Sequence, residues 1–136
     1  MMYFLDSNVI IDLIDGNSNV LENLKKNYQE DENSVKIPDL VYYEVLRGFR
    51  YKKAQKKEQV FIRFCRQFGI VQMSLKTMEI AADNYARLLH DGIPLSDDDD
   101  ILIGSLAVEH EAILVTSNTK HLGRIDGIKL EDWTRD

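Results

Sequence analysis

Residues 3–11 read Tyr3-Phe-Leu-Asp-Ser-Asn-Val-Ile-Ile11, so that two apolar segments are joined by three polar residues. Three apolar residues followed at once by an acid predict a short buried strand over residues 3–5. Ser7 or Asn8 is then expected to cap a helix that ends at Gly16. A strand that passes directly into a helix is typical of an α/β fold.

The rest of the chain continues this alternation. Short apolar runs predict further strands at residues 35–37, 70–73 and 112–116, and a last one at 128–130. Apolar residues at helical spacing predict helices between them, at residues 20–28, 39–49, 53–68, 78–89 and 101–111. Strands separated by helices form a central parallel sheet with helices on both faces. With 136 residues, we expect a single α/β domain that spans residues 1–136.

Three acids lie beside apolar segments. Asp6 follows the first strand, Glu44 lies within Leu40–Leu46, and Asp100 ends the run Asp97–Asp100 directly ahead of an apolar helix. A carboxylate beside a core-forming segment loses water, which is costly unless a partner replaces it. Three such acids would repel one another if the fold gathered them. A divalent cation with oxygen ligands removes that repulsion, so the pattern predicts a Mg²⁺ or Mn²⁺ site.

Each acid also has a purely structural interpretation. Asp6 fits a helix cap, Glu44 can pair with Arg47, and acids are common in the first turn of a helix. Taken singly, each structural interpretation is favoured. Taken together, the three acids favour a site, because all of them stand where the chain otherwise has apolar or neutral residues.

The composition bounds the class of protein. Hydrophobic residues make up 44% of the chain and charged residues 29%, as in soluble globular proteins. A single cysteine, Cys65, forms no internal disulfide and fits a reducing compartment. Asp6 and Asp12 interrupt the apolar start, so no secretory signal and no membrane span are expected. We therefore expect a cytoplasmic protein with no membrane partner.

The net charge of −6 conceals a basic stretch at residues 47–66. This stretch holds eight basic residues against Glu58 alone, a net charge of +7. A solvated helix face is one explanation. The other is a cationic surface for a polyanion whose phosphates pass the acidic site. On that hypothesis the residues that contact RNA or the acidic groups of a partner are Arg47, Arg50, Lys52 and Lys53.

Five blocks of sequence together resemble the PIN-domain nucleases, and among them the VapC-type toxins of toxin–antitoxin pairs. The resemblance covers nearly the whole chain, and each block alone is weak. The blocks are Tyr3-Phe-Leu-Asp-Ser-Asn-Val-Ile-Ile, Val41-Tyr-Tyr-Glu-Val-Leu-Arg-Gly, Asp100-Ile-Leu-Ile-Gly, Ala112-Ile-Leu-Val-Thr-Ser-Asn-Thr-Lys-His-Leu and Ile125-Asp-Gly-Ile-Lys-Leu-Glu-Asp-Trp.

The resemblance implies which residues carry the chemistry. Asp6, Glu44 and Asp100 match the family's catalytic, metal-binding acids. Asn118 stands at a fourth position that is often acidic, where an amide orients a water but adds no charge. Asp98 is a candidate to supply the missing charge through water, whereas Asp97 and Asp99 are expected to be exposed.

Ser7 matches a supporting position, where its hydroxyl can bond a water of the site. The resemblance also implies a metal-dependent endoribonuclease, a homodimer, and a VapB-like antitoxin that restrains the enzyme. The alternative is a PIN-fold RNA-binding protein, either non-catalytic or housekeeping, without an antitoxin. A phosphatase of α/β type is less consistent, because Asn8 replaces the second aspartate of the phosphatase pattern.

Overall fold

Five parallel strands form the centre of the computed structural model, which describes residues 1–135 and so leaves Asp136 of the predicted domain outside. The strands are β1 (Tyr3–Leu5), β2 (Val35–Pro38), β3 (Ile70–Val71), β4 (Ile113–Val115) and β5 (Lys129–Glu131). Their order across the sheet is β3-β2-β1-β4-β5, and every neighbouring pair is parallel. The predicted parallel sheet is therefore confirmed.

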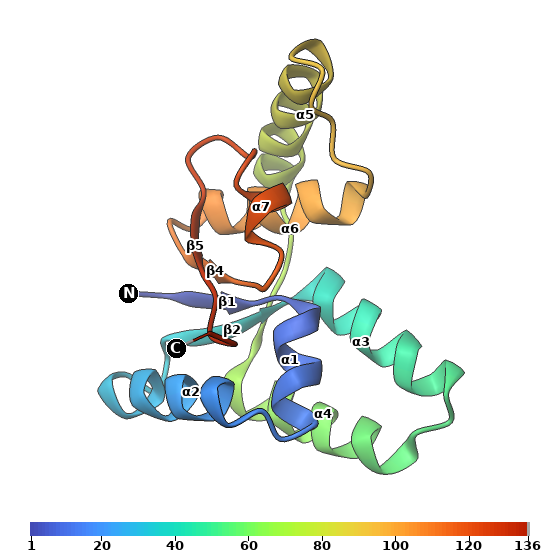
Figure 1. The fold of residues 1–136 in the computed structure, drawn as a ribbon, viewed down its shortest axis with the longest axis vertical. Coiled ribbons are helices and arrows are strands. Elements are labelled where there is room, and N and C mark those ends of the chain that lie inside the picture. Colours follow the sequence, from blue (N-terminus) through green and yellow to red (C-terminus); the bar gives the residue numbers. More distant parts are fainter. Residues whose placement is uncertain (136) are drawn as a thin grey trace.

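Helices cover both faces of this sheet (Figure 1). On one side lie α1 (Ser7–Ile14), α2 (Ser18–Glu30), α3 (Asp39–Tyr51) and α4 (Gln55–Phe68), with α1 packed against the other three. On the other side lie α5 (Leu75–His90), α6 (Asp98–Glu109) and the short α7 (Thr119–Leu122), with α6 packed against α5, α7 and β4. The α/β prediction holds in both its sheet and its two helical layers.

The core is continuous through the strands. Phe4, Leu5, Ile37, Leu114 and Val115 are all fully buried. Two-sided burial explains why the central strands β1 and β4 carry no charged residue and do not alternate in polarity. The free thiol of Cys65 lies in the same core.

The register of the two central strands fixes the site. Leu5 pairs with Val115, so the residues that follow them, Asp6 and Thr116, meet at the carboxyl edge of the sheet. The strand order reverses direction between β1 and β4, which is where α/β sheets bind ligands. A functional site is therefore expected at this edge of the sheet.

The cap predicted for the first helix was wrong, whereas the structural interpretation of Asp6 as a helix cap is confirmed. Asp6, rather than Ser7 or Asn8, is the N-cap of α1, because its side chain accepts a hydrogen bond from the Ser7 N–H. Asp39 is the first residue of α3 and not its cap. Its carboxylate accepts bonds from the backbone N–H groups of Leu40 and Met73, the second of which ties the helix start to the segment after β3.

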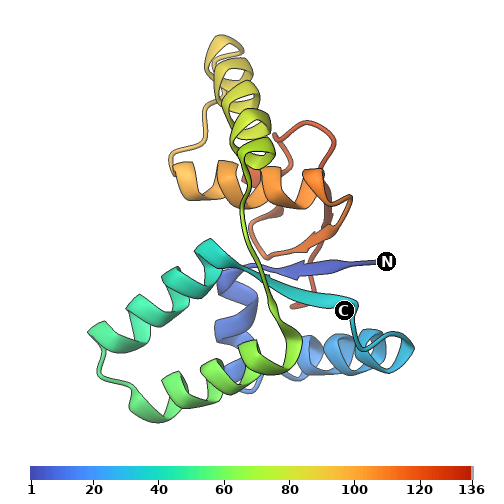
Figure 2. The ribbon, with the colours of Figure 1, turned by 180° about the vertical axis from the view of Figure 1, so that it is seen from behind.

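The helices α3 and α4 form a projecting hairpin, seen from both sides in Figures 1 and 2. Only residues 52–54 join them, and Lys53 adopts a positive φ of 56° at this turn. The helix predicted from Lys53 thus begins at Gln55. Within residues 1–135, no helix has the length and apolar character needed to cross a membrane.

Candidate metal centre

Asp6 is held at the end of β1 by three hydrogen-bond donors. Its side chain is 4% exposed and accepts bonds from the Ser7 backbone (2.9 Å), the Thr116 hydroxyl (2.8 Å) and the Asn8 amide (3.4 Å). Burial nevertheless raises the pKa of Asp6 above its ordinary value. The carboxylate is thus fixed in orientation and only partly compensated in charge.

Thr116 organises this edge and was not among the residues predicted for the site. Besides donating to Asp6, its oxygen accepts from the Asn8 amide (3.3 Å) and from the Asn118 backbone N–H (3.0 Å). The side-chain carbonyl oxygen of Asn8 in turn accepts a hydrogen bond from the Ser117 backbone N–H. One signal pointed to Thr116: it directly follows the most apolar strand, as Asp6 follows β1, and parallel strands align their carboxyl ends.

Glu44 approaches from α3 with one oxygen left unsatisfied. Its Oε1 is buried and has no hydrogen-bond partner among residues 1–135. Burial, together with the negative charges of Asp6 and Asp99, raises the pKa of Glu44 to about 7. A buried carboxylate oxygen without a donor is costly, and a bound cation would satisfy it.

The aspartate run begins α6. Asp97 is the N-cap and accepts from the Asp99 N–H, and the next three acids occupy the first turn. Oxygen atoms of Asp97, Asp99 and Glu44 all lie within 4.8 Å of one another, close enough to hold one metal ion. Burial, with the charges of Asp6 and Asp97, raises the pKa of Asp100 to about 6.

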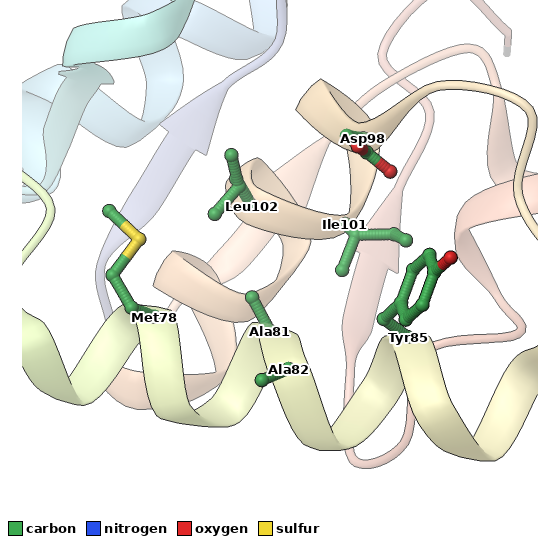
Figure 3. A pocket seen from close by; sticks show the side chains of 7 residues that line it. All are labelled: Met78, Ala81, Ala82, Tyr85, Asp98, Ile101 and Leu102. Carbon is green, nitrogen blue, oxygen red and sulfur yellow. The ribbon is translucent and has the colours of Figure 1, made fainter.

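Of the two aspartates beside Glu44, Asp97 is exposed as predicted and Asp99 is not. Asp99 is partly buried and faces Glu44, and Asp97, although exposed, joins the same group. Asp98 is exposed and lines a groove between α5 and α6 instead, as Figure 3 shows. Successive helical residues turn by about 100°, so neighbours in one helical turn cannot all face the same point. Asp97 and Asp99 therefore lie beside Glu44, whereas Asp98 lies on the side of α6 that faces α5.

The other predicted site residues lie around these acids. The Asn118 side chain is half-buried, and its Oδ1 lies 2.9 Å from Nδ1 of His121. The Ser7 side chain is also half-buried, and within residues 1–135 its hydroxyl has no hydrogen-bond partner. Both side chains are thus near Asp6 without being part of its hydrogen-bond network, in contrast to Thr116 and Asn8.

The basic stretch divides into paired and unpaired cations. Arg50 lies 3.3 Å from Glu58 of α4, and Lys57 lies 2.8 Å from Asp15 at the end of α1, so both brace the hairpin. The remaining predicted contacts, Arg47, Lys52 and Lys53, are exposed and have no salt bridge in the described part of the chain. These three are available to an external anion.

Comparisons with known proteins agree with this arrangement. The PIN domain family matches residues 3–128. Ribonuclease VapC2 of Rickettsia felis is 32% identical over 142 residues, which cover 99% of this chain and all of that protein. The crystal structure of VapBC2 from Rickettsia felis, bound to a DNA fragment from its promoter, superposes with a TM-score of 0.87 at 27% identity, over 98% of this chain and 99% of that one.

A more distant structure shares the fold. DNA-bound VapBC from Salmonella typhimurium gives a TM-score of 0.84 at 21% identity, over 98% of each chain. The family match spans strands β1 to β4, both helical layers and every acid described above, and ends just before β5. With this match and a relative 32% identical along its whole length, the chain belongs to the PIN domain family.

Proposed function

We propose that the chain is a metal-dependent endoribonuclease toxin that hydrolyses RNA phosphodiester bonds. The observation that carries the proposal is the buried, unpartnered Glu44 Oε1, whose carboxylate lies beside those of Asp97 and Asp99 and is close enough to Asp6 for that charge to raise its pKa. The relative named Ribonuclease VapC2 supports the activity. A non-catalytic RNA-binding protein is not favoured, because Asp6, Glu44 and Asp100 are all present.

Asp6, Glu44 and Asp100 would hold the cation, with Asp97 and Asp99 in support. Carboxylate oxygens are the ligands of hard cations, so we propose Mg²⁺ or Mn²⁺. A cation bound there supplies charge neutralisation and lowers the pKa of a water. Thr116 and Asn8 hold the Asp6 carboxylate in place, and Ser7 and Asn118 present polar groups for water at the rim.

The exposed cations of the α3–α4 hairpin would bind the RNA backbone. Arg47 stands beside the acids, and Lys52 and Lys53 extend the positive charge to the tip of the hairpin. Because Arg50 is already paired with Glu58, we expect it to contribute less to RNA binding than its position in the sequence suggested. Charge reversal of Lys52 and Lys53 is expected to weaken RNA binding and to flatten its salt dependence.

A toxin of this kind needs a restraint in the cytoplasm, where its RNA substrates are. We propose an antitoxin whose basic side chain, preferably an arginine, enters the acidic centre, since a guanidinium pairs with two carboxylates at once. Expression alone should arrest growth, and co-expression of the adjacent gene should relieve the arrest. Harmless expression of an active enzyme would favour the housekeeping alternative.

We further propose a homodimer that buries the apolar groove between α5 and α6. The apolar stripe of α5 is only partly buried, because Met78, Tyr85 and Leu89 are 41%, 52% and 54% exposed. Figure 3 shows Met78 and Tyr85 lining this groove with residues of α6. A contiguous apolar surface of this kind marks an interface.

The aromatic residues Tyr42, Tyr43 and Phe49 of α3 offer a second apolar surface, but two of the three pack in the core. Tyr42 and Phe49 pack on Phe61, and only Tyr43 is exposed. Light scattering tests the dimer: Tyr85→Asp should give a monomer, whereas Tyr51→Asp, at an exposed ring on α3, should not. A wild-type monomer with full activity would exclude a required dimer.

The central test of the function is RNA cleavage by the purified chain. Cleavage is expected with Mg²⁺ or Mn²⁺, and it should stop in EDTA and in Glu44→Gln. Glu22→Gln neutralises an exposed acid on α2 and should leave cleavage intact. Cleavage in EDTA, or full activity of Glu44→Gln, would overturn the proposal.

A further inference from the structure

Tyr43 and Arg47 form a pair at the rim of the acidic centre. They lie four residues apart on α3, which places side chains next to each other on one helix face. The Arg47 guanidinium carbon lies 5.0 Å from the centroid of the Tyr43 ring, within range of a cation–π interaction. Tyr43 is 55% exposed, so much of its aromatic surface remains open to solvent.

This ring is not needed for packing. Its neighbour Tyr42 stacks on Phe61 at 5.6 Å between ring centroids and belongs to the interface of α3 with α4. Tyr43 is exposed, and within residues 1–135 its ring stacks on no other aromatic ring and contacts the Arg47 guanidinium. An exposed aromatic ring held by an arginine is an arrangement that stacks on flat ligands.

The surroundings of the pair indicate which ligand. Tyr43 precedes Glu44 directly, and the Arg47 charge interacts with Glu44 and Asp99. On the other side, Lys52 and Lys53 continue the positive charge along the hairpin. A chain of phosphates that follows these cations to the acids would carry its bases past the open Tyr43 ring.

We propose that Tyr43 and Arg47 form a stacking platform for an unpaired nucleobase next to the scissile phosphate. Arg47 fixes the ring and contacts the adjacent phosphate, and Tyr43 receives the face of the base. Such a platform selects single-stranded RNA, since a base within a duplex is already stacked on its neighbours. The inference rests on the proposed ribonuclease function and names its substrate class.

The test measures binding apart from cleavage. In the Asp6→Asn background, a short single-stranded RNA that contains the fluorescent base 2-aminopurine serves as the probe. Stacking on tyrosine should quench its fluorescence, and anisotropy of a labelled strand gives the affinity. Tyr43→Leu should lose the quenching and weaken binding about tenfold, because one stacked base contributes about 1–3 kcal/mol and 1.4 kcal/mol corresponds to tenfold.

Three controls separate stacking from charge and from folding. Tyr43→Phe keeps the ring and should behave as the wild type. Arg47→Lys keeps the charge, so the salt dependence should persist while part of the quenching is lost. Duplex RNA of the same sequence should bind equally to Tyr43→Leu and to the parent, since no base is free to stack.

The outcomes distinguish this inference from the function on which it rests. If Tyr43→Leu binds single-stranded RNA as tightly as its parent, or loses duplex binding equally, the platform is refuted even though the wild-type chain cleaves RNA. That result would leave Tyr43 as a surface for a protein partner. If the wild-type chain cleaves no RNA, the ribonuclease proposal fails instead.

Discussion

The two ends of helix α6 hold carboxylates in opposite ways. At its start, Asp100 is half-buried near Asp6, Asp97 and Asp99, and its pKa is raised to about 6. At its end, Glu109 accepts hydrogen bonds from the hydroxyls of Ser74 (3.0 Å) and Thr77, and its pKa is lowered, with the Thr77 bond as the main cause.

The helix dipole alone would lower the pKa of the acid at the start of α6 and raise the pKa of the acid at its end. It favours negative charge at a helix start and disfavours it at a helix end, by about 0.3–1 kcal/mol. Burial and neighbouring acids outweigh it at the first end, and two hydroxyl donors outweigh it at the second. Carboxylates that raise one another's pKa are costly to the fold, so they indicate function, whereas a carboxylate with its donors in place indicates structure.

Neutralising an acid near the start of α6, either Asp100 or Glu44 of the adjacent α3, should contrast most strongly in activity with neutralising Glu109 at its end. Glu44→Gln or Asp100→Asn is expected to reduce RNA cleavage by more than about 100-fold, since even changes next to metal ligands cost about 10–100-fold. Glu109→Gln should cleave at the wild-type rate. Equal losses in both groups, measured with the same RNA, would remove the distinction between the two ends.

Two fully buried threonines allow the same comparison to be made for the hydrogen-bond donors of these carboxylates. Thr116 donates to Asp6, and Thr77 donates to Glu109. Replacing either by valine should destabilise the fold by about 1–3 kcal/mol, because a buried polar group loses its partner. Only Thr116→Val should also lose cleavage, by about 10–100-fold, since Thr116 orients a proposed ligand. Denaturation and cleavage measured on the same samples check both claims, and a cleavage loss in Thr77→Val would contradict them.

The stability of the metal-free protein should depend on pH through Glu44 and Asp100. Their pKa values in the folded chain, about 7 and about 6, lie above the ordinary values of 4.5 and 3.8. The folded state therefore binds these protons more tightly than the unfolded state. The resulting stability is fully present below the ordinary values and is lost as the pH rises through about 6 and about 7.

Melting curves in EDTA at several pH values measure this loss. The double variant E44Q/D100N should show a smaller decline between pH 4.5 and 7 than the wild type. The difference between the two proteins isolates the two carboxyls from all other titrating groups. Parallel declines would mean that these acids do not strain the fold.

The smallest expected effect is on the free energy of unfolding, at the end of α6 where Glu109 lies. Glu109→Gln should lower the free energy of unfolding by about 0.5–1 kcal/mol, because a charged acceptor is replaced by a neutral one that still fits. Urea denaturation at neutral pH is sufficient to detect it. If Glu109→Gln stabilised the fold, Glu109 would belong with Glu44 and Asp100, whose charges destabilise the metal-free protein.

The sequence predicted the strands and the acids because both depend on local composition. The run Ile113–Val115 is apolar enough to require a buried strand, and Asp6 directly follows another such strand. The last strand was predicted within one residue, at 128–130 against Lys129–Glu131. Periodicity places elements well and leaves their ends less certain.

Features that depend on strand register or on tertiary contacts could not be predicted from the sequence. Thr116 matters because β1 pairs with β4 so that Leu5 faces Val115. Asp99 rather than Asp98 approaches Glu44 because α6 begins at Asp98. The stripe on α5 has the helical period of a core face, yet α6 covers only part of it, and periodicity does not reveal which part stays exposed.

Thermal melting with and without metal tests the central claim most directly. The claim is that Glu44 of α3 and the acids at the start of α6 destabilise the fold until a cation binds. In EDTA, Glu44→Gln should melt at a higher temperature than the wild type. Addition of Mg²⁺ or Mn²⁺ should raise the melting temperature of the wild type and have little effect on Glu44→Gln. A wild-type protein that does not respond to either metal, or a Glu44→Gln variant less stable than the wild type in EDTA, would contradict the account.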